Sequence, residues 1–489
     1  MKTFYDLIFD ENKNWDKEIL FTNVNGYSLR DIHSKVEEYT HILQSNGGIK
    51  GKKVAVLIPD LPVYFALLIA INRLGGTCVP LSHQFRNEDL SKVLNLTRPH
   101  IIFTVKKHYR TSFFDMIKDW AQAKFIQTKI YAHENNRFES HIIQGYTMDE
   151  TSKGIDFIAC TSGSTGLPKG VMLQASSLDE WTKILESELE LTKIDRLFMT
   201  IPYTAPYGIS WLLTCFKNEI AMVIPESFDM PLVMKLLEEN PCNKIITTPS
   251  IFKGIYIFAK SVKPNILHDL QLCILGGEPI NEEFMSVVKD FNNCRLLNAY
   301  GISEQGLLAF TNDLKSEAVK WSFCKNVQFK MNAVSSDGIG ELMIKTPYGF
   351  DGYYQDEELT SEAFTGDGWF FTGDLVRTND QGALEMVGRK KQMIKKGGVQ
   401  VIPAEIEQIL IQYPPILQSA VIGIPHKVYG EEIIAFIVSD NDISLDSLFS
   451  FLRSRIAGFK VPGRIIKIKE MPIIQGKMDK MALKKLAVS

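Results

Sequence analysis

The loop of residues 161–170 carries the densest group of potential phosphate ligands in the chain. It reads Thr-Ser-Gly-Ser-Thr-Gly-Leu-Pro-Lys-Gly and follows the apolar run 155–160, which is short enough to form a buried strand. Its glycines allow a sharp turn in which successive N–H groups point into one concavity, and its hydroxyls and Lys169 add donors and a positive charge. A Walker A loop would have a second glycine five residues after Gly163, where Pro168 stands. The loop therefore predicts a polyphosphate site of another type.

Further motifs follow the loop in order along the chain: Gly276-Gly277-Glu278-Pro279, Asn298-Ala299-Tyr300-Gly301-Ile302-Ser303-Glu304, Thr372-Gly373-Asp374, Gly388-Arg389-Lys390-Lys391 and Gly476-Lys477. Together with the loop they resemble the motifs of the acyl-adenylate-forming superfamily. This superfamily includes acyl-CoA synthetases, aryl-CoA ligases, stand-alone adenylation enzymes and luciferases. The resemblance extends from about residue 25 to the C-terminus.

The resemblance implies a reaction in two halves: a carboxylic acid and ATP form an acyl-AMP and pyrophosphate, and a thiol then displaces AMP to give a thioester. Both halves pass through a crowded anionic centre, so we expect catalysis by positioning and electrostatic stabilisation. The implied ligands of Mg²⁺ are Thr165 and Glu304, because this hard cation binds hydroxyl and carboxylate oxygens. The β and γ phosphates are assigned to Thr161, Ser162, Gly163, Ser164, Thr165, Gly166 and Lys169.

The nucleoside is assigned to the later motifs. Tyr300 offers an aromatic face for adenine, and Asp374, which follows a glycine turn, is expected to accept both ribose hydroxyls. Arg389 is expected to donate to the same sugar or to the α-phosphate. The base edge is expected to meet the backbone around Gly277, Glu278, Pro279, Asn298 and Ala299, and the resemblance also assigns Gly301 and Ser303 to the nucleotide.

Near the C-terminus, Lys477 is similar to the family's catalytic lysine, and its ammonium is expected to bridge the carboxylate and the α-phosphate. The same group would obstruct an incoming thiol. The resemblance therefore implies a mobile C-terminal domain of residues 389–489 that rotates on residues 1–388 about a hinge at Lys391. The paired glycines of residues 397–400 would then let a pantetheine arm pass close to the backbone.

The acid is read from residues 202–211, Pro-Tyr-Thr-Ala-Pro-Tyr-Gly-Ile-Ser-Trp, which contain no carboxylate that could pair with a buried ammonium. An α-amino acid is therefore disfavoured. Family members often place an aromatic residue or His where this chain has Ala205. We favour an aromatic acid such as a hydroxybenzoate, with a medium- or long-chain fatty acid as the alternative. The expected pocket residues are Thr204, Ala205, Tyr207, Gly208 and Phe252, with Ser210 and Trp211 nearby.

The acceptor thiol is left open between CoA and the phosphopantetheine of a separate acyl or aryl carrier protein. Two other classes compete with the ligase: a luciferase-like oxygenase, and a non-catalytic nucleotide-binding protein. A binding-only descendant would have no need of Lys477, so the intact motif set favours the enzyme.

These motifs need elements to position them, and the pattern predicts an α/β fold. Strand and helix signals alternate from Val54 to Val105 and again from Ala221 to Phe291. Open sheets of this kind bind ligands beyond the carboxyl ends of their strands, where we expect the loop and the motifs to converge. The sequence thus predicts a large N-terminal domain of stacked sheets with flanking helices, a small barrel-like subdomain after Gly338, and a small α+β C-terminal domain.

Composition excludes several other classes. The chain has 489 residues, 45% hydrophobic and 23% charged, which is typical of a globular protein of more than one domain. A net charge of −3 gives no pull toward nucleic acid or an anionic membrane. The seven cysteines lack metal-ligand spacing, the first residues lack an apolar signal core, and no run is long enough to span a bilayer. These features predict a cytoplasmic protein.

Overall fold

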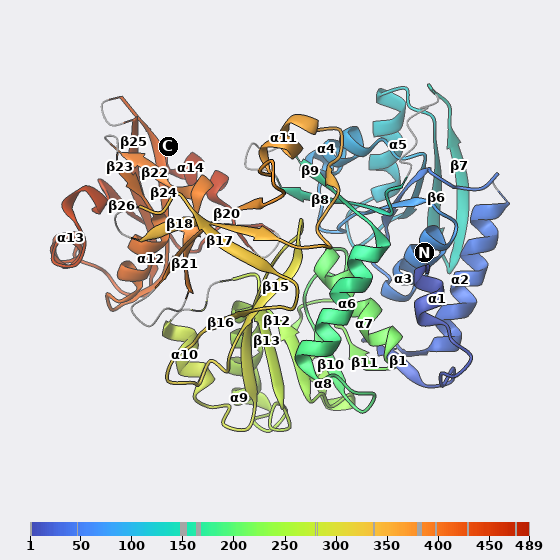
Figure 1. Cartoon of the computed structure of the whole chain (residues 1–489), viewed down its shortest axis with the longest axis horizontal. Helices are drawn as coiled ribbons and strands as arrows, with labels where there is room; N and C mark the ends of the chain where they lie inside the picture. The colour runs from blue at the N-terminus through green and yellow to red at the C-terminus, as the bar shows by residue number, and fades with distance from the viewer. Residues whose placement is uncertain are drawn as a thin grey trace. The chain divides into compact units, whose positions relative to one another are not determined.

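The computed structural model describes residues 2–45, 47–146, 154–162, 168–278, 280, 282–335, 338–378, 384–396, 399–427, 430–474 and 477–488. The contacts between residues divide the chain, drawn in Figure 1, into two compact units. Unit 1 comprises Met1–Gln328 and Lys345–Glu362, and unit 2 comprises Phe329–Ile344 and Ala363–Ser489. The boundary expected at residue 389 is the point about which the C-terminal domain would rotate, whereas the two units are defined by packing. That boundary therefore stays a prediction.

Unit 1 contains a sheet with the strand order β19-β9-β8-β4-β3-β5-β6-β7. Its central strands are parallel and buried, as in α/β sheets covered on both faces, and antiparallel strands close its ends. The strands are β3 (Lys53–Leu57), β4 (Thr77–Pro80), β5 (Ile101–Val105), β6 (Thr128–Glu134), β7 (Arg137–Ile143), β8 (Phe157–Ser162), β9 (Pro168–Leu173) and β19 (Gly352–Tyr353).

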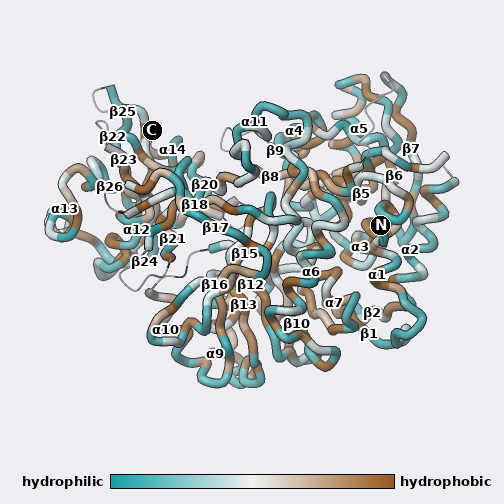
Figure 2. Tube along the Cα trace, viewed as in Figure 1, coloured by the Kyte–Doolittle hydropathy of each residue, from teal (hydrophilic) through white to brown (hydrophobic). Residues whose placement is uncertain are grey.

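A second sheet of unit 1 has the order β16-β15-β14-β13-β12-β10-β11-β1-β2. Its central strands are parallel and its edge strands antiparallel. Strands such as β12 and β13 consist mainly of hydrophobic residues (Figure 2). The strands are β1 (Glu18–Phe21), β2 (Gly26–Ser28), β10 (Arg196–Met199), β11 (Ala221–Val223), β12 (Lys244–Thr247), β13 (Leu272–Gly276), β14 (Arg295–Ile302), β15 (Gly306–Thr311) and β16 (Trp321–Phe323).

Helices cover these sheets. Helix α3 is apolar on all sides, and every residue from Leu61 to Asn72 is buried, as expected for a helix enclosed by other elements. Helices α6 and α7 pack on each other, and both contact β15. The helices of unit 1 are α1 (Phe4–Ile8), α2 (Leu29–Gln44), α3 (Leu61–Arg73), α4 (Asn87–Thr97), α5 (Phe113–Ala123), α6 (Ala175–Leu189), α7 (Pro206–Lys217), α8 (Met230–Glu239), α9 (Pro249–Val262), α10 (Glu282–Val288) and α11 (Glu357–Glu362).

In unit 2, the region expected to be barrel-like contains a sheet of order β17-β18-β20-β21, in which β20 is antiparallel to both of its neighbours. The strands are β17 (Gln328–Asn332), β18 (Ile339–Lys345), β20 (Phe370–Thr378) and β21 (Leu384–Arg389). The short 3₁₀ helix η1 (Lys390–Gln392) follows β21.

The rest of unit 2 is built on the long hairpin of β24 (Ile416–His426) and β25 (Gly430–Ser439). Successive residues of a strand face opposite sides of the sheet. Val421 therefore packs with helices α12 (Pro403–Ile411) and α13 (Leu445–Arg453), while Ala420 packs with α14 (Lys480–Val488). The remaining elements are β22 (Ile394–Lys396), β23 (Val399–Val401), η2 (Gly458–Lys460), β26 (Arg464–Lys467), β27 (Ile473–Ile474) and β28 (Lys477–Met478).

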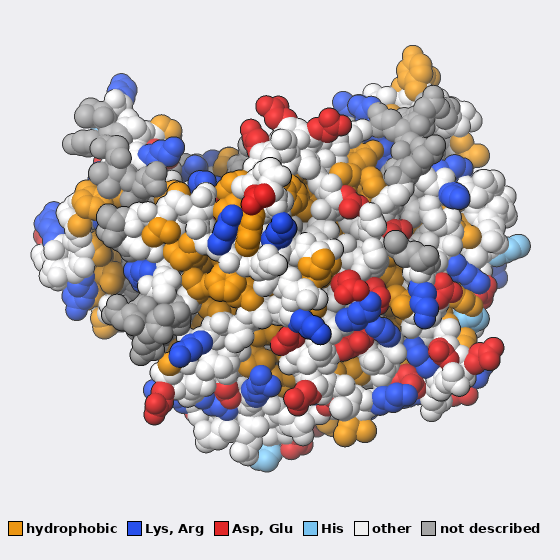
Figure 3. Space-filling model, in the orientation of Figure 1, with side chains coloured by type: hydrophobic (Ala, Val, Ile, Leu, Met, Phe, Trp, Pro, Cys, Tyr) orange, Lys and Arg blue, Asp and Glu red, His pale blue; other side chains and the backbone are white. Residues whose placement is uncertain are grey.

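The predicted α/β class with a smaller α+β part is confirmed. Acidic and basic side chains are interspersed on the face of unit 1 in view (Figure 3), in keeping with the small net charge. No helix within the described part of the chain is long and apolar enough to cross a membrane.

Candidate active site

The segment that the sequence predicts to bind phosphate is paired as two antiparallel strands at both ends rather than forming a loop along its whole length. Strand β8 continues to Ser162, and Thr161 lies opposite Lys169 in the antiparallel pairing with β9. The expected loop 161–170 was therefore drawn too long at both ends, because backbone groups committed to a strand ladder are not available to a phosphate. Its central residues Gly163, Ser164, Thr165 and Gly166 lie outside the described residues.

Lys169 and Glu304 meet at one aromatic side chain, Tyr353. The Tyr353 hydroxyl donates to Glu304 Oε1 at 2.9 Å, and Lys169 Nζ lies 4.9 Å from the centroid of the same ring. Glu304 is further fixed by its carbonyl oxygen, which accepts the N–H of Phe350 at 2.7 Å. Burial and then the Glu304 carboxylate raise the pKa of Tyr353, so its hydroxyl stays a donor.

This meeting point joins the two sheets of unit 1. Lys169 stands on β9 of the first sheet, whereas Glu304 follows β14 of the second. We expected the loop and the motifs to converge beyond the ends of their strands. Lys169 and Glu304 do meet, although their strands belong to different sheets, because β19 pairs with β9 and places Tyr353 between them. Tyr353 was missed because a tyrosine in a short strand carries no chemical signature in sequence.

The two charged groups of this site suit a divalent cation and a phosphate. The Glu304 carboxylate is a hard oxygen ligand of the kind that Mg²⁺ prefers, and the nearby ammonium of Lys169 favours anions. Thr165, the other expected ligand, is not among the described residues. When bound, Mg²⁺ would neutralise charge on the phosphates, with Glu304 among its ligands.

The expected adenine segments are neighbours in the second sheet. Strands β13 and β14 are parallel, with Gly276 opposite Ala299. Gly277 has a positive φ of 80° and open space where a Cβ would stand, so backbone is exposed there. The carboxylate of Glu278 accepts the N–H and the hydroxyl of Ser250, in the first turn of α9. Pro279 lies outside the described residues.

Tyr300 lies on β14 against Trp321, with ring centroids 6.1 Å apart in an edge-on arrangement. A register shift between Tyr300 and Gly301 bends the strand before the turn that carries Ser303 and Glu304. Asn298 is anchored by its N–H, which donates to Thr311 Oγ1 at 2.9 Å.

The expected ribose ligands are paired within unit 2. Asp374 on β20 lies opposite Arg389 on β21, and Arg389 Nε is 2.5 Å from Asp374 Oδ1. The Asp374 side chain is 3% exposed and that of Arg389 41%, so the carboxylate is held at the base of the pair while the guanidinium reaches solvent.

The expected hinge residue, Lys391, is exposed and stands in η1. Lys477 is in β28, opposite Ile474; the glycines 397 and 398 are outside the described residues.

The expected pocket residues divide between wall and core. Thr204 and Ala205 precede α7 and are half-buried. Gly208 allows a close approach, because a Cβ there would lie 2.1 Å from the carbonyl oxygen of Pro202. Phe252 is fully buried between Phe284 and Phe291. Its assignment as a pocket wall is corrected to the core formed by α8, α9 and α10.

Ser210, which was expected near the pocket, is fully buried, and its hydroxyl donates to the carbonyl of Tyr207 at 2.9 Å. It therefore serves the helix instead.

Two buried polar atoms around α6 and α7, Trp181 Nε1 and Tyr348 Oη, have no hydrogen-bond partner among the described residues. Such orphans are rare and mark a place where a ligand or water supplies the partner. Trp181 and Tyr348 were not predicted, since isolated aromatic residues in apolar surroundings read as core. The neighbouring Tyr207 hydroxyl and Trp211 indole interact with each other, so they are only weakly satisfied.

These side chains come from adjoining segments. The Tyr207 and Trp211 rings are 6.2 Å apart, and a Cβ at Gly306 of β15 would lie 2.1 Å from the Trp181 ring. The hydroxyl of Ser177, one turn before Trp181, donates to the carbonyl of Gly349 beside Tyr348 at 3.4 Å.

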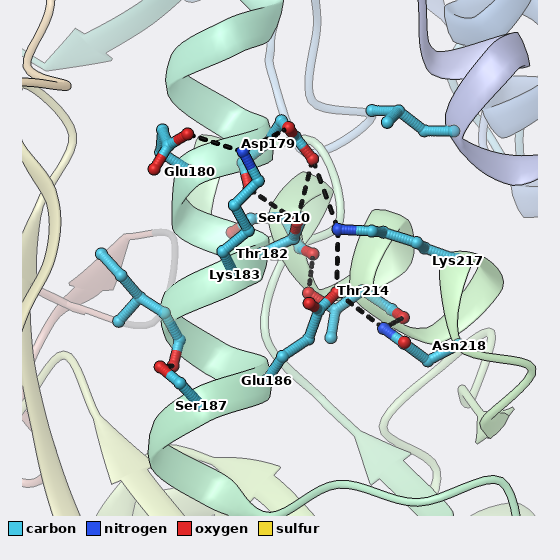
Figure 4. A network of polar contacts seen from close by, with 12 residues as sticks. Asp179, Glu180, Thr182, Lys183, Glu186, Ser187, Ser210, Thr214, Lys217 and Asn218 are labelled. Atoms are coloured by element: carbon cyan, nitrogen blue, oxygen red, sulfur yellow. Dashed lines mark hydrogen bonds and ion pairs between the residues drawn. The ribbon is translucent and has the colours of Figure 1, made fainter.

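A polar network joins the side of α6 to the C-terminal end of α7 (Figure 4). Lys217 Nζ lies 3.1 Å from Glu186 and 3.5 Å from Asp179, and Asn218 donates to Glu186 at 2.7 Å. These contacts hold the relative position of the helices that carry Trp181, Tyr207 and Trp211.

Comparison with known proteins assigns the family. The AMP-binding enzyme model matches residues 10–354, and the model of the AMP-binding enzyme C-terminal domain matches residues 405–475. A 2-succinylbenzoate–CoA ligase of Listeria monocytogenes is 25% identical over 94% of each chain. A medium-chain fatty-acid–CoA ligase of Escherichia coli is 27% identical over 89% of this chain and 81% of its own.

Among solved structures, ATP-bound MatB from Rhodopseudomonas palustris superposes with a TM-score of 0.85 at 22% identity, covering 99% of this chain and 98% of that one. This similarity supports the fold. The chain therefore belongs to the AMP-binding enzyme family, and its enzyme class is the one that the motifs predicted, an AMP-forming acid–thiol ligase.

Proposed function

We propose that the protein uses ATP and Mg²⁺ to convert a carboxylic acid to its acyl-AMP, and then transfers the acyl group to a phosphopantetheine thiol. The observation that carries this proposal is the convergence of Lys169 and Glu304 on Tyr353, since both are motif residues from different sheets. A cation beside a carboxylate suits a triphosphate and its metal.

In this mechanism the chain's residues act chiefly by binding and orienting. Lys169 and the hairpin segment would hold the β and γ phosphates, and Glu304 the metal. Asp374 and Arg389 would bind the ribose, and Lys477 would stabilise charge between the carboxylate and the α-phosphate. Rotation about Lys391 would then exchange Lys477 for the segment 397–400.

The orphan donors support a polar aromatic acid as the substrate. Indole N–H groups only donate and a tyrosine hydroxyl also accepts, so together they suit a ring substituent such as a hydroxyl, whose oxygen accepts. A saturated alkyl chain in the same place would leave these groups unsatisfied, which is costly when they are buried. Succinylbenzoate, the acid in the name of the Listeria relative, is also aromatic.

A medium- or long-chain fatty acid remains the alternative, because the Escherichia coli relative is named for medium-chain acids at similar identity. The thiol acceptor is proposed as CoA on the names of both relatives, with a separate carrier protein as the other candidate.

Acid-dependent exchange of labelled pyrophosphate into ATP tests the proposal. We expect exchange with hydroxybenzoates to exceed exchange with octanoate and palmitate, and CoA to convert the adenylate to a thioester. Exchange with fatty acids alone would favour the alternative acid, whereas ATP binding without exchange for any acid would identify a non-catalytic nucleotide-binding protein. Apo and holo carrier proteins in place of CoA identify the acceptor.

A further inference from the structure

We infer that Tyr353 is a positioning residue for adenylation: its hydroxyl orients the Glu304 carboxylate and its ring holds the Lys169 ammonium. The inference rests on the proposed function of these two motif residues. It assigns a role to a side chain that belongs to none of the motifs from which the site was predicted.

The geometry of β19 places the Tyr353 ring between the other two groups. Tyr353 pairs with Val171 on β9, and Lys169 lies two residues before Val171 on the same face of that strand. A long side chain can reach such a diagonal neighbour across a strand pair. The face of the ring therefore meets the ammonium at 4.9 Å, and its hydroxyl extends to Glu304 Oε1 at 2.9 Å.

The position of the ring is itself fixed. Tyr353 is 6% exposed, and its ring packs edge-on against Phe350 with centroids 4.9 Å apart. Its backbone N–H donates to Thr360 Oγ1 at 2.8 Å. Because Phe350 also donates its N–H to the carbonyl of Glu304, the segment that carries Tyr353 holds the backbone and the side chain of the same glutamate.

A purely structural role would give a different pattern, and the next residue supplies the comparison. Tyr354 points to the opposite side of the strand, where its hydroxyl accepts from the buried ammonium of Lys53 at 2.7 Å. The hydroxyl of Tyr354 therefore bonds to a different partner from the hydroxyl of Tyr353, and its ring belongs to the core of the first sheet. Tyr354 is thus a matched control that removes a buried hydroxyl from the same strand end without reaching the site.

The consequence of losing the Tyr353 hydroxyl follows from its partner. A carboxylate with one oxygen bonded has fewer orientations, so less order is lost when its other oxygen binds a cation. Tyr353→Phe keeps the ring over Lys169 and removes only this constraint. Tyr353→Leu removes the ring as well and should also weaken ATP binding in the absence of metal.

The test measures binding of a non-hydrolysable ATP analogue by calorimetry, with and without Mg²⁺, beside exchange at varied free Mg²⁺. For Tyr353→Phe we expect the half-saturating Mg²⁺ concentration to rise about tenfold or more, since hydrogen bonds to charged groups are worth ~1.5–3 kcal/mol. The gain in analogue affinity on adding Mg²⁺ should shrink by a similar factor. Tyr354→Phe should lower the melting temperature and leave both Mg²⁺ readouts as in the wild type.

A double-variant comparison shows whether Tyr353 acts through Glu304. If it does, Glu304→Gln combined with Tyr353→Phe should bind and exchange no worse than Glu304→Gln alone, to within about twofold. The inference would be overturned if the double variant lost activity by the product of the two single-variant losses. It would also be overturned if Tyr353→Phe needed no more Mg²⁺ than the wild type. Failure of the wild type to exchange with any acid would instead count against the proposed function, because Mg²⁺-dependent analogue binding still reports on Tyr353.

Discussion

At the scale of single residues, the pair of Asp374 and Arg389 makes a direct prediction about ATP. Asp374→Asn keeps the size of a nearly buried side chain and removes its charge, so the ribose hydroxyls lose their charged acceptor. We expect the KM for ATP in pyrophosphate exchange to rise about tenfold or more, as for the loss of hydrogen bonds to a charged group. The melting temperature should change little, because Arg389 is 41% exposed and remains hydrated.

The same strands offer a control for this prediction. Arg377 on β20 pairs with Glu385 on β21 at 3.0 Å, in the next part of the same ladder, and both side chains are more than 40% exposed. Arg377→Gln removes a cross-strand ion pair without touching the site. If it raised the KM for ATP as much as Asp374→Asn, the effect would come from the strands rather than from ribose binding.

Sequence patterns identified residues well where several motifs supported one another. Glu304 and Lys169 were assigned from separate motifs, and the structure brings them to one ring. Tyr353 escaped detection because its role depends on a partner 49 residues away and on a strand pairing that local sequence does not encode. Phe252 failed for the opposite reason, since an aromatic residue near a site has the same pattern as one in the core.

At the scale of elements, the segment after β21 carries the hinge prediction. Lys391 stands in η1, a turn closed by the N–H of Met393, which donates to the carbonyl of Lys390 at 3.2 Å. A 3₁₀ helix has a φ close to that of proline, so Lys391→Pro fits the φ at residue 391, while it disfavours helical backbone at Lys390 and restricts rotation at both residues. We expect thioester formation to fall about tenfold or more while pyrophosphate exchange changes less than about threefold.

Lys391→Ala is the control for the hinge, because it removes the charge and leaves the backbone free to rotate. It should retain both half-reactions. An equal loss of both half-reactions in Lys391→Pro would show that the turn supports the fold or the adenylation step rather than the exchange of domains.

A second element-scale prediction concerns Glu407 on α12. Its Oε1 accepts the N–H of Val421 on β24 at 2.7 Å, and Lys480 Nζ lies 3.8 Å away. Burial raises the pKa of Glu407 despite both contacts, so the folded state holds this proton more tightly than the unfolded chain. Its contribution is therefore favourable below the unfolded pKa and is lost as the pH rises through the folded pKa.

Glu407→Gln stays neutral and avoids this loss. Between about pH 4 and about pH 7, the melting temperature of the variant minus that of the wild type should therefore increase with pH. Glu405→Gln on the same helix, which breaks the pair with Lys460 at 2.6 Å, should show no such increase. A difference that narrows as the pH rises would contradict the burial argument.

Strand and helix positions were predictable where hydrophobic periodicity is strong. The alternation predicted from Val54 to Val105 corresponds to the elements from β3, which begins at Lys53, to β5, which ends at Val105. The extension of β8 to Ser162 was missed because Thr, Ser and Gly favour a loop by composition. Antiparallel pairing with β9 decides otherwise, and pairing is not a local property.

At the scale of the whole molecule, the sequence could not say which strands share a sheet. Strand β1 near the N-terminus pairs with β11, and β19 pairs with β9, although each pair of strands is far apart in the sequence. Because of such long-range pairings, the hairpin of β8 and β9 lies in one sheet and the motifs that follow β13 and β14 lie at another. The α/β class was nevertheless predictable from the alternation of strands and helices, whereas the stacking of two sheets was implied by the family resemblance.

The cysteines allow the stability of unit 1 to be followed in the intact protein. All seven lie in unit 1, free and buried except for the half-buried Cys160. Burial raises the pKa of Cys160, Cys242, Cys294 and Cys324 to about 12 and that of the others as well. Because the thiolate is the reactive form, a thiol reagent should label the six buried cysteines of the native protein only after unit 1 opens.

If Lys169 and Glu304 bind the nucleotide, its binding should hold unit 1 closed. A non-hydrolysable ATP analogue with Mg²⁺ at ~100 times its Kd should therefore slow labelling at about pH 8 by up to about a hundredfold, the factor by which binding reduces the open population. Glu304→Gln should show much less protection at the same ligand concentration, and labelling in denaturant gives the total of seven thiols. Rapid labelling of a buried thiol in the native protein would contradict the burial on which this prediction depends, and labelling unaffected by nucleotide would separate the site from the stability of unit 1.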